Sequence, residues 1–164
     1  MMTTPNRGLA AMAAAIAIAA AAPARAADAD PAILSTIDAA IGAINSGSVA
    51  DLQAVFTEAP SAIVDDFAPF AWSGKSAVAA YAHDLQAVLT QYKITDWRFQ
   101  RQTPRYLFAT DTRAEAIIPA SFPFVLGGKP QSVAADWVFV LDKQDGKWKI
   151  DVMSFGDTHH TLLP

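Results

Sequence analysis

The chain has 164 residues and no cysteine, and its 16 acidic and 12 basic side chains give a net charge of −4. An acidic protein of this kind is not expected to bind nucleic acid or an anionic membrane surface, since both repel negative charge. Without cysteine, the fold cannot use disulfide bonds and must depend on its hydrophobic core.

The first 26 residues have the pattern of a signal peptide. A short polar start containing Arg7 precedes an apolar run over residues 9–22, and Ala24-Arg25-Ala26 has the form of a cleavage site. The run has 14 residues, fewer than the roughly 20 that cross a bilayer as a helix. We therefore expect a signal peptide over residues 1–26, one domain over residues 27–164, a periplasmic or secreted location, and no membrane attachment after cleavage.

Three helices are predicted in the first half of the domain. The first begins at Asp30-Pro31, where an acid can cap the helix and a proline suits its first turn, and it ends at residues 45–47, Asn-Ser-Gly. A shorter helix is expected from Ser48 to about Phe56. The third helix has a stripe of apolar and aromatic residues at helical spacing: Val78, Tyr81, Ala82, Leu85, Val88, Leu89 and Tyr92.

A short apolar strand, Ala62–Asp65, lies between the second and third helices. It delivers two acids, Asp65 and Asp66, into a turn rich in proline and aromatic residues. A carboxylate at the end of a buried strand costs several kcal/mol unless it is paired, hydrated or used in function. Asp65 is therefore the first candidate for a functional residue.

Four longer strands are predicted after the third helix. They cover about residues 94–108, 112–126, 131–142 and 147–155, with hairpin turns at Gly127-Gly128 and Asp145-Gly146. Pro119 and Pro123 are expected to mark bulges or an exposed edge of the second of these strands, because proline donates no backbone hydrogen bond.

The predicted strand 131–142 is apolar on both faces. Val138 and Val140 lie on one face, and Trp137, Phe139 and Leu141 lie on the other. Such a strand needs cover on both sides. We expect the helices to cover one face of the sheet and a second copy of the chain to cover the outer face, as a homodimer.

The order of these elements resembles that of the nuclear-transport-factor-2-like superfamily, particularly its SnoaL-like members. The resemblance rests on the Asn-Ser-Gly after the first helix, the acid-turn-Ser-Gly block at residues 65–74 and the Asp-Gly-Lys-Trp hairpin at residues 145–148. It implies an α+β fold, a cone-shaped barrel of three N-terminal helices packed in a curved antiparallel sheet, with a pocket at its open end. This fold hosts many chemistries and many non-enzymes.

Within that superfamily, the spacing from the acid-bearing strand to Ser73-Gly74 is similar to that of ketosteroid isomerase. This similarity implies that Asp65 is a catalytic general base and that Asp136 is a protonated acid that donates to an oxyanion. The tyrosine that serves as the other oxyanion donor in that enzyme is replaced by Ala40. Loss of one such donor typically costs a few kcal/mol of transition-state stabilisation, so steroid isomerisation is not expected.

The residues themselves support two carboxyls with separate roles. If Asp136 faces the helices together with Val138, burial would raise its pKa, whereas Asp65 at the mouth of a pocket would stay ionised. Other interpretations stay open: Asp65 is equally consistent with capping of its turn, and Asp136 with a charge at an edge or a dimer interface.

The remaining candidates are ligand-binding residues. Tyr81 could pack in the core or donate its hydroxyl into the cavity, and three aromatic residues of the turn could form a lid or, as we favour, a plug. His83 should face solvent, and His159-His160 lacks further ligands nearby in sequence for a metal. The candidate ligand-binding residues are Tyr81, Phe67, Phe70, Trp72 and Val138.

The residues and the resemblance together favour a cofactor-free isomerase, cyclase or dehydratase that acts on a small hydrophobic molecule, with Asp65 as the base and Asp136 as the acid. No metal or cofactor site is predicted. The alternatives are a non-catalytic protein that binds a hydrophobic ligand in the same cavity and a structural dimerisation module.

Overall fold

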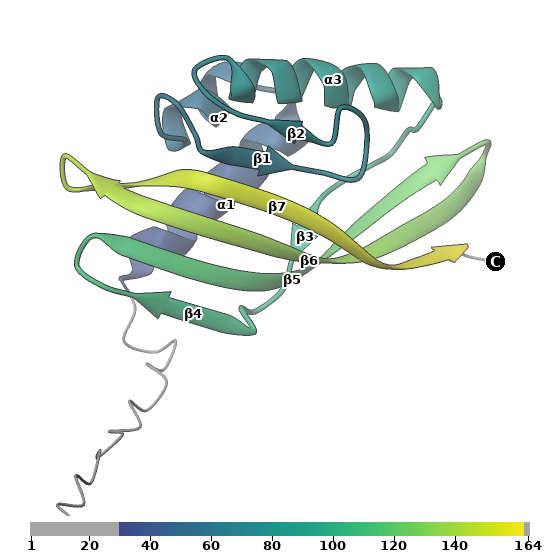
Figure 1. Cartoon of the computed structure of the whole chain (residues 1–164). Helices are drawn as coiled ribbons and strands as arrows, with labels where there is room; N and C mark the ends of the chain where they lie inside the picture. The colour runs from purple at the N-terminus through teal and green to yellow at the C-terminus, as the bar shows by residue number, and fades with distance from the viewer. Residues whose placement is uncertain (1–29, 163–164) are drawn as a thin grey trace, which may run out of the picture.

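The computed structural model describes residues 30–162, with side chains as far as Thr158. The predicted signal peptide, residues 1–26, lies outside the described residues. The elements follow one another in the order α1 (Pro31–Ser46), α2 (Val49–Val55), β1 (Ala62–Val64), β2 (Ala71–Trp72), α3 (Ala77–Gln91), β3 (Gln100–Arg101), β4 (Tyr106–Ala109), β5 (Arg113–Leu126), β6 (Lys129–Gln144) and β7 (Lys147–Leu162) (Figure 1).

The ends of the helices follow their capping residues. The side chain of Asp30 accepts a hydrogen bond from the Ala32 N–H at 2.9 Å, and Gly47 ends α1 with a φ of 69°. This left-handed conformation favours glycine, which has no Cβ. Ser48 caps α2 by accepting from the Asp51 N–H at 3.3 Å. Within the described part of the chain, no helix is both long and apolar enough to cross a bilayer.

The seven strands form one open sheet in the order β2-β1-β7-β6-β5-β3, and β4 also pairs with β5. Strands β1 and β7 run parallel, whereas the other strand pairs are antiparallel. The α+β class is therefore confirmed, but the expectation of a purely antiparallel sheet is wrong. The parallel pair arises because the chain leaves β1, crosses through β2 and α3, and returns to β1 only with its last strand.

The predicted strand 94–108 is divided into the short strands β3 and β4, whereas both predicted hairpin turns are present. Pro119 and Pro123 mark neither a bulge nor an edge, because β5 has neighbours on both sides and pairs with β6 without a register shift. Proline lacks the amide donor but keeps its acceptor. The Pro119 carbonyl accepts from the Gln102 N–H at 2.8 Å, and the Pro123 carbonyl accepts from the Arg98 N–H at 3.1 Å.

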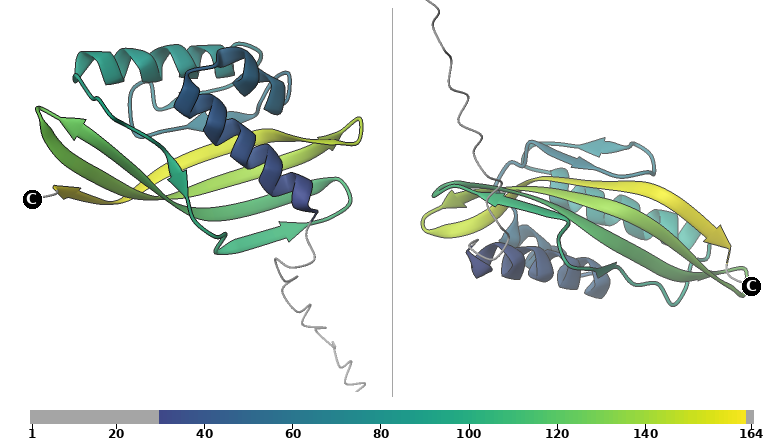
Figure 2. Two further views of the ribbon diagram at one scale, coloured as in Figure 1. Left: turned by 180° about the vertical axis from the view of Figure 1, so that it is seen from behind. Right: turned by 90° about the horizontal axis from the view of Figure 1, so that it is seen from below.

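The two faces of the sheet differ in what covers them. Trp137, Phe139 and Leu141 of β6 are fully buried in the core shared with the helices, and we call their side of the sheet the inner face. Helix α1 runs across this face (Figure 2). Val138 and Val140 lie on the opposite side, the outer face, and are only half-buried.

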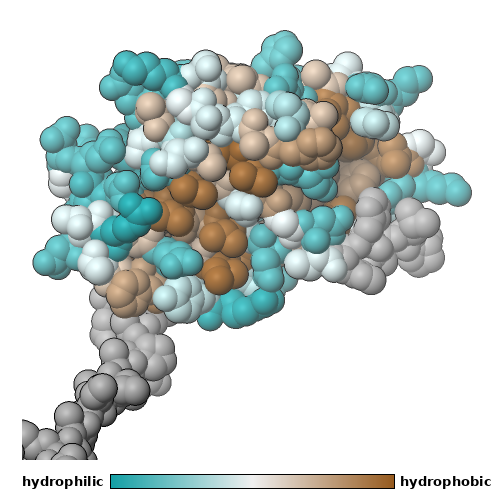
Figure 3. Space-filling model, in the orientation of Figure 1, coloured by the Kyte–Doolittle hydropathy of each residue, from teal (hydrophilic) through white to brown (hydrophobic). Residues whose placement is uncertain are grey.

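Two neighbouring rows of mostly apolar side chains cross the outer face, where Figure 3 shows hydrophobic residues gathered over the sheet. One row runs through paired residues of five strands, and the next row continues beside it. Val64, Tyr106 and Phe108 are 36%, 41% and 42% exposed. The first row contains Val64, Ser154, Val138, Ile117 and Tyr106, and the second contains Val152, Val140, Glu115 and Phe108, so a serine interrupts one row and an exposed acid the other.

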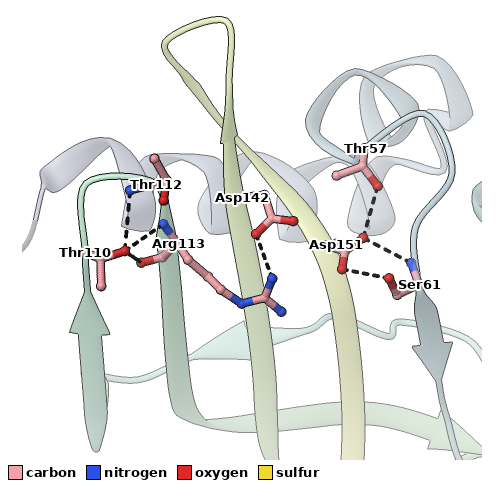
Figure 4. Close-up of polar contacts among 7 residues, drawn as sticks. All are labelled: Thr57, Ser61, Thr110, Thr112, Arg113, Asp142 and Asp151. Carbon is pink, nitrogen blue, oxygen red and sulfur yellow. Dashed lines mark hydrogen bonds and ion pairs between the residues drawn. The ribbon is translucent and has the colours of Figure 1, made fainter.

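Polar contacts border these apolar rows. Arg113 of β5 donates to the Asp142 carboxylate of β6 at 3.0 Å (Figure 4). Asp151, at the register shift between β6 and β7, accepts from the backbone N–H of Ser61 at 3.1 Å and from its hydroxyl at 2.8 Å. Asp151 therefore holds the segment that leads into β1 against β7, which fixes the start of the strand that carries Asp65.

Candidate functional site

Asp65 follows the last residue of β1 and opens the tight turn that leads to β2. Its backbone N–H donates to the Phe70 carbonyl at 3.2 Å, and the Phe70 N–H donates to the Phe67 carbonyl at 2.8 Å. Phe70 has a φ of 72°, and the Ala68-Pro69 peptide bond is cis. The two backbone hydrogen bonds fold the turn back on itself, and the Asp65 side chain points toward α3, where it contacts Tyr81.

The Asp65 carboxyl is buried and held at both oxygens. Only 5% of the residue is exposed. Its Oδ2 accepts a hydrogen bond from the Tyr81 hydroxyl at 3.0 Å, and its Oδ1 accepts from the Asp66 N–H at 2.8 Å. Tyr81 comes from α3 and is itself fully buried. One strand end and one helix face therefore fix the position of a single carboxyl.

Burial raises the pKa of Asp65 to about 7, although the hydrogen bonds from the Asp66 N–H and the Tyr81 hydroxyl act in the opposite direction. Burial also raises the pKa of Tyr81 well above its ordinary value, and the nearby Asp65 carboxylate adds to this effect. Near neutral pH, Asp65 can thus take up or release a proton while Tyr81 stays a hydrogen-bond donor. A carboxyl perturbed in this way is typical of functional sites.

An aromatic cluster packs against Tyr81, the residue that donates to Asp65. The rings of Phe67 and Trp72 lie 6.0 Å and 5.2 Å from the ring of Tyr81, between centroids. The Trp72 indole N–H donates to Asp84 Oδ2 at 2.8 Å, and this bond, followed by the contact with His83, holds the pKa of Asp84 below its ordinary value. Trp72 therefore joins β2 to α3 through two contacts, its ring packing on Tyr81 and its hydrogen bond to Asp84.

A cavity of about 170 Å³ opens beside Asp65, between α3 and the inner face of the sheet; we call it the Asp65 cavity. Its walls are aliphatic residues of α3 together with phenylalanine side chains, and three carboxyls also line it. The phenylalanines are Phe67, Phe99, Phe122, Phe124 and Phe155, and the carboxyls are those of Asp65, Asp66 and Asp157.

A larger hollow of about 720 Å³ lies between the α1–α2 pair and α3. Among the described residues that line it, only Tyr81 and His83 can titrate, and none is a carboxyl. His83 is exposed, as expected, and its ring contacts Asp84 at 3.1 Å. Because acid–base chemistry needs a poised donor or acceptor, the smaller Asp65 cavity is the better candidate site despite its size.

The orientation expected for Asp136 was wrong. Asp136 lies on the outer face of β6, together with Val138 and Val140. There Arg105 donates a hydrogen bond to its Oδ2 at 2.9 Å. The sheet therefore separates it from Asp65, and the two carboxyls do not meet in one cavity. A strand with two apolar faces turns its largest side chains inward, since these fill the core, and that choice sends Asp136 outward.

The predicted ligand-binding residues are divided between several places. Phe67 lines the Asp65 cavity, whereas Tyr81 and Trp72 are buried beside it without lining it. Phe70 is 57% exposed and is neither a lid nor a plug. Val138 lies on the outer face, so its assignment to the pocket was wrong.

Sequence reasoning missed Asp157 because it ended the last strand at residue 155. Strand β7 continues to Leu162, and residues alternate between its faces. Met153 and Phe155 are buried on the inner face, and Asp157 is next in the same alternation. A longer strand would have predicted an acid at the mouth of the cavity.

No protein-family profile matches the chain, and no curated protein matches it. Several solved structures are similar to the chain in fold. The chain is similar to a hexachlorocyclohexane dehydrochlorinase, LinA type 2, with 15% identity and a TM-score of 0.69, covering 82% of this chain and 88% of that one. It is also similar to a scytalone dehydratase-like protein from Novosphingobium aromaticivorans, with 15% identity, a TM-score of 0.63, and coverage of 82% and 87%.

A third similar structure is a protein from Nostoc punctiforme with a cystatin-like fold, with 14% identity, a TM-score of 0.60, and coverage of 83% and 95%. At these identities the similarity concerns the fold. The chain has the nuclear-transport-factor-2-like fold that the order of its elements predicted.

Proposed function

We propose that the protein is a cofactor-free enzyme that removes a proton from carbon in a small hydrophobic substrate, with Asp65 as the general base. In this proposal the helices and the curved sheet form a cone, and the substrate enters the Asp65 cavity. The observation that carries the proposal is a buried carboxyl with a pKa of about 7 that lines an apolar cavity. A base is most effective when its pKa lies near the working pH.

Each neighbour of Asp65 has a part in this proton transfer. The ionised carboxylate keeps the hydrogen bonds from the Tyr81 hydroxyl and the Asp66 N–H, so its remaining lone pairs are free for a substrate proton. Tyr81 acts as a positioning residue, because it contacts the carboxylate and does not line the cavity. The protonated Asp65 can afterwards return the proton to another atom of the substrate.

Elimination is the reaction class that this arrangement supports best. Isomerisation through an enolate needs a donor for the developing oxyanion, and the sheet removes Asp136 from that role. In an elimination, the electron pair of the broken C–H bond forms the double bond while the leaving group departs with its own pair. Similarity to a dehydrochlorinase and to a dehydratase-like protein supports a lyase of this kind.

The experiment is a general test of a carbon base, the ring-opening elimination of 5-nitrobenzisoxazole. Asp65 would take the proton at C3, the N–O bond would break, and the nitrile phenolate product would absorb visible light. We expect a rate that rises with pH with a midpoint near the Asp65 pKa of about 7. Asp65→Asn should lower kcat/KM by about 10²–10⁴-fold, the usual contribution of a general base.

Asp136→Asn is the matched control, since it neutralises a carboxyl on the other side of the sheet. Its rate should stay near that of the wild type. An Asp65→Asn variant that binds the probe and reacts as fast as the wild type would replace the proposal with the alternative, a protein that only binds a hydrophobic ligand.

We also propose export and self-association. The pattern of residues 1–26 supports a periplasmic or secreted location after signal removal. The exposed apolar rows of the outer face support a homodimer, because a second copy would remove Tyr106 and Phe108 from water.

A further inference from the structure

We propose that the Asp65 cavity binds a small organic cation, an ammonium group carried on an apolar or aromatic body. The inference rests on the site assigned in the proposed function and adds the chemical class of its ligand. It depends on the charge, the wall chemistry and the size of the cavity, and does not require that Asp65 be catalytic.

The ionisable side chains that the structure describes at the cavity are all acidic. Asp65, Asp66 and Asp157 line it, and none of the described lining residues is Lys, Arg or His. Asp66 and Asp157 are exposed and lie at the mouth, whereas Asp65 is 5% exposed and lies inside. Among the described residues, no basic side chain forms an ion pair with any of the three. Carboxylates in a cleft with low-dielectric walls attract cations and repel anions.

The walls are suited to the same kind of ligand. Phe99 packs on Phe122 with ring centroids 4.5 Å apart and on Phe155 at 5.3 Å. Phenylalanine faces carry partial negative charge, so a cation near them is attracted, and an apolar body gains contact area from the same rings. The walls thus favour an ammonium group on a hydrocarbon over a hydrated inorganic ion.

The placement of the acids argues against a metal ion as the occupant. Among the described residues, no group of three or more His, Cys, Asp or Glu side chains could hold a metal ion. The two mouth acids come from different elements, Asp66 from the turn after β1 and Asp157 from β7. A cavity of about 170 Å³ suits a molecule with one small ring.

A bound ammonium group would also affect the base. A positive charge near a carboxyl stabilises its ionised form. Asp65, whose pKa is raised by burial, would therefore be held as a carboxylate in the complex and be ready to accept a proton.

The test compares three ligands of similar shape, benzylamine, benzyl alcohol and benzoate, titrated into the full-length protein by calorimetry at pH 6. Benzylamine is then an ammonium ion. We expect it to bind about tenfold more tightly than benzyl alcohol, with benzoate the weakest, and we expect added NaCl to weaken only the amine. Asp157→Asn and Asp66→Asn should each weaken the amine several-fold and leave benzyl alcohol unchanged. Asp111→Asn, on an exposed turn, should change neither.

Two results would overturn the inference: equal or tighter binding of benzyl alcohol, or unchanged amine affinity in both mouth variants. The Asp65→Asn variant separates this inference from the proposed function. Preferential amine binding without any elimination activity would leave a cation-binding protein and remove the enzyme. Elimination that depends on Asp65 without amine preference would keep the base and remove the cationic ligand.

Discussion

Asp65 is subject to opposing influences of different size. Two hydrogen bonds stabilise its charged form, from the Tyr81 hydroxyl at 3.0 Å and the Asp66 N–H at 2.8 Å, yet removal from water outweighs both. In the native state, burial therefore favours the protonated form of the Asp65 carboxyl over the ionised form. Such a group lowers the stability of the fold whenever it is ionised, a cost typical of sites kept for function.

Asp65→Asn should stabilise the fold in a pH-dependent way. The folded pKa of about 7 lies above the ordinary 3.8, so the native state binds the proton more tightly than the unfolded chain does. The wild type consequently loses stability as pH rises from about 4 through about 7, and the loss is complete above that range. At pH 8 the variant should exceed the wild type in unfolding free energy by about 1–3 kcal/mol, and this advantage should vanish near pH 4.

Urea denaturation at pH 4, 6 and 8 measures this difference, with Asp111→Asn as the control for loss of an exposed charge. A difference that is the same at every pH would show that Asp65 titrates normally, and its assignment as a poised base would then fail.

At the scale of elements, one side chain connects α1 to the segment that leads into β3. Asn45 lies near the end of α1 and is only half-buried. Its amide nitrogen donates to the Phe99 carbonyl at 2.9 Å, and its oxygen accepts from the Phe99 N–H at 2.8 Å. The helix thereby holds a residue whose ring lines the Asp65 cavity.

Asn45→Ala should destabilise the protein by about 1–3 kcal/mol, because both backbone groups of Phe99 lose their partners. Chemical denaturation measures this loss. Ser46→Ala is the matched control, since the neighbouring serine is exposed and bonds only within its own helix, and it should stay within about 0.5 kcal/mol. Equal effects of the two substitutions would mean that Asn45 does not hold the segment.

The sequence predicted where helices and strands lie better than it predicted which side of a strand points toward the helices. Local signals such as Asp30 and Gly47 define the ends of a helix, so the helices could be placed from the chain alone. Asp65 was found because an acid directly after a short apolar strand is unusual. The direction of Asp136 was missed because both faces of its strand are apolar, and only the larger side chains on the Trp137 face indicate which one meets the helices. Asp157 needed the true length of β7, which its pairing with β6 determines.

At the scale of the whole molecule, the outer face carries charges of both signs at its two borders, and Glu115 adds an exposed acid between them. The apolar rows are bordered on one side by the Arg105–Asp136 pair and on the other by the Arg113–Asp142 pair. Because each border carries both signs, a two-fold axis through the apolar rows would bring mixed charges against mixed charges. Most soluble homo-oligomers associate about such an axis.

Val138→Lys should therefore convert the proposed homodimer to a monomer, since it places a charge in the middle of the row that runs from Val64 to Tyr106. Light scattering after size-exclusion chromatography measures the mass. Ala39→Lys is the control, because it adds the same charge on an exposed position of α1 and should leave the dimer intact. A wild type that elutes as a monomer at every accessible concentration would contradict the proposed homodimer.

The parallel pairing of β1 with β7 has a consequence for the order of folding. Ala62 pairs with Val152, 90 residues further along the chain. Contacts between such distant residues form slowly, because a long loop must close before they are gained. The strand that carries Asp65 is therefore expected to be among the last to be fixed. During synthesis, the cavity and its buried acid would be completed only when the final strand has been made.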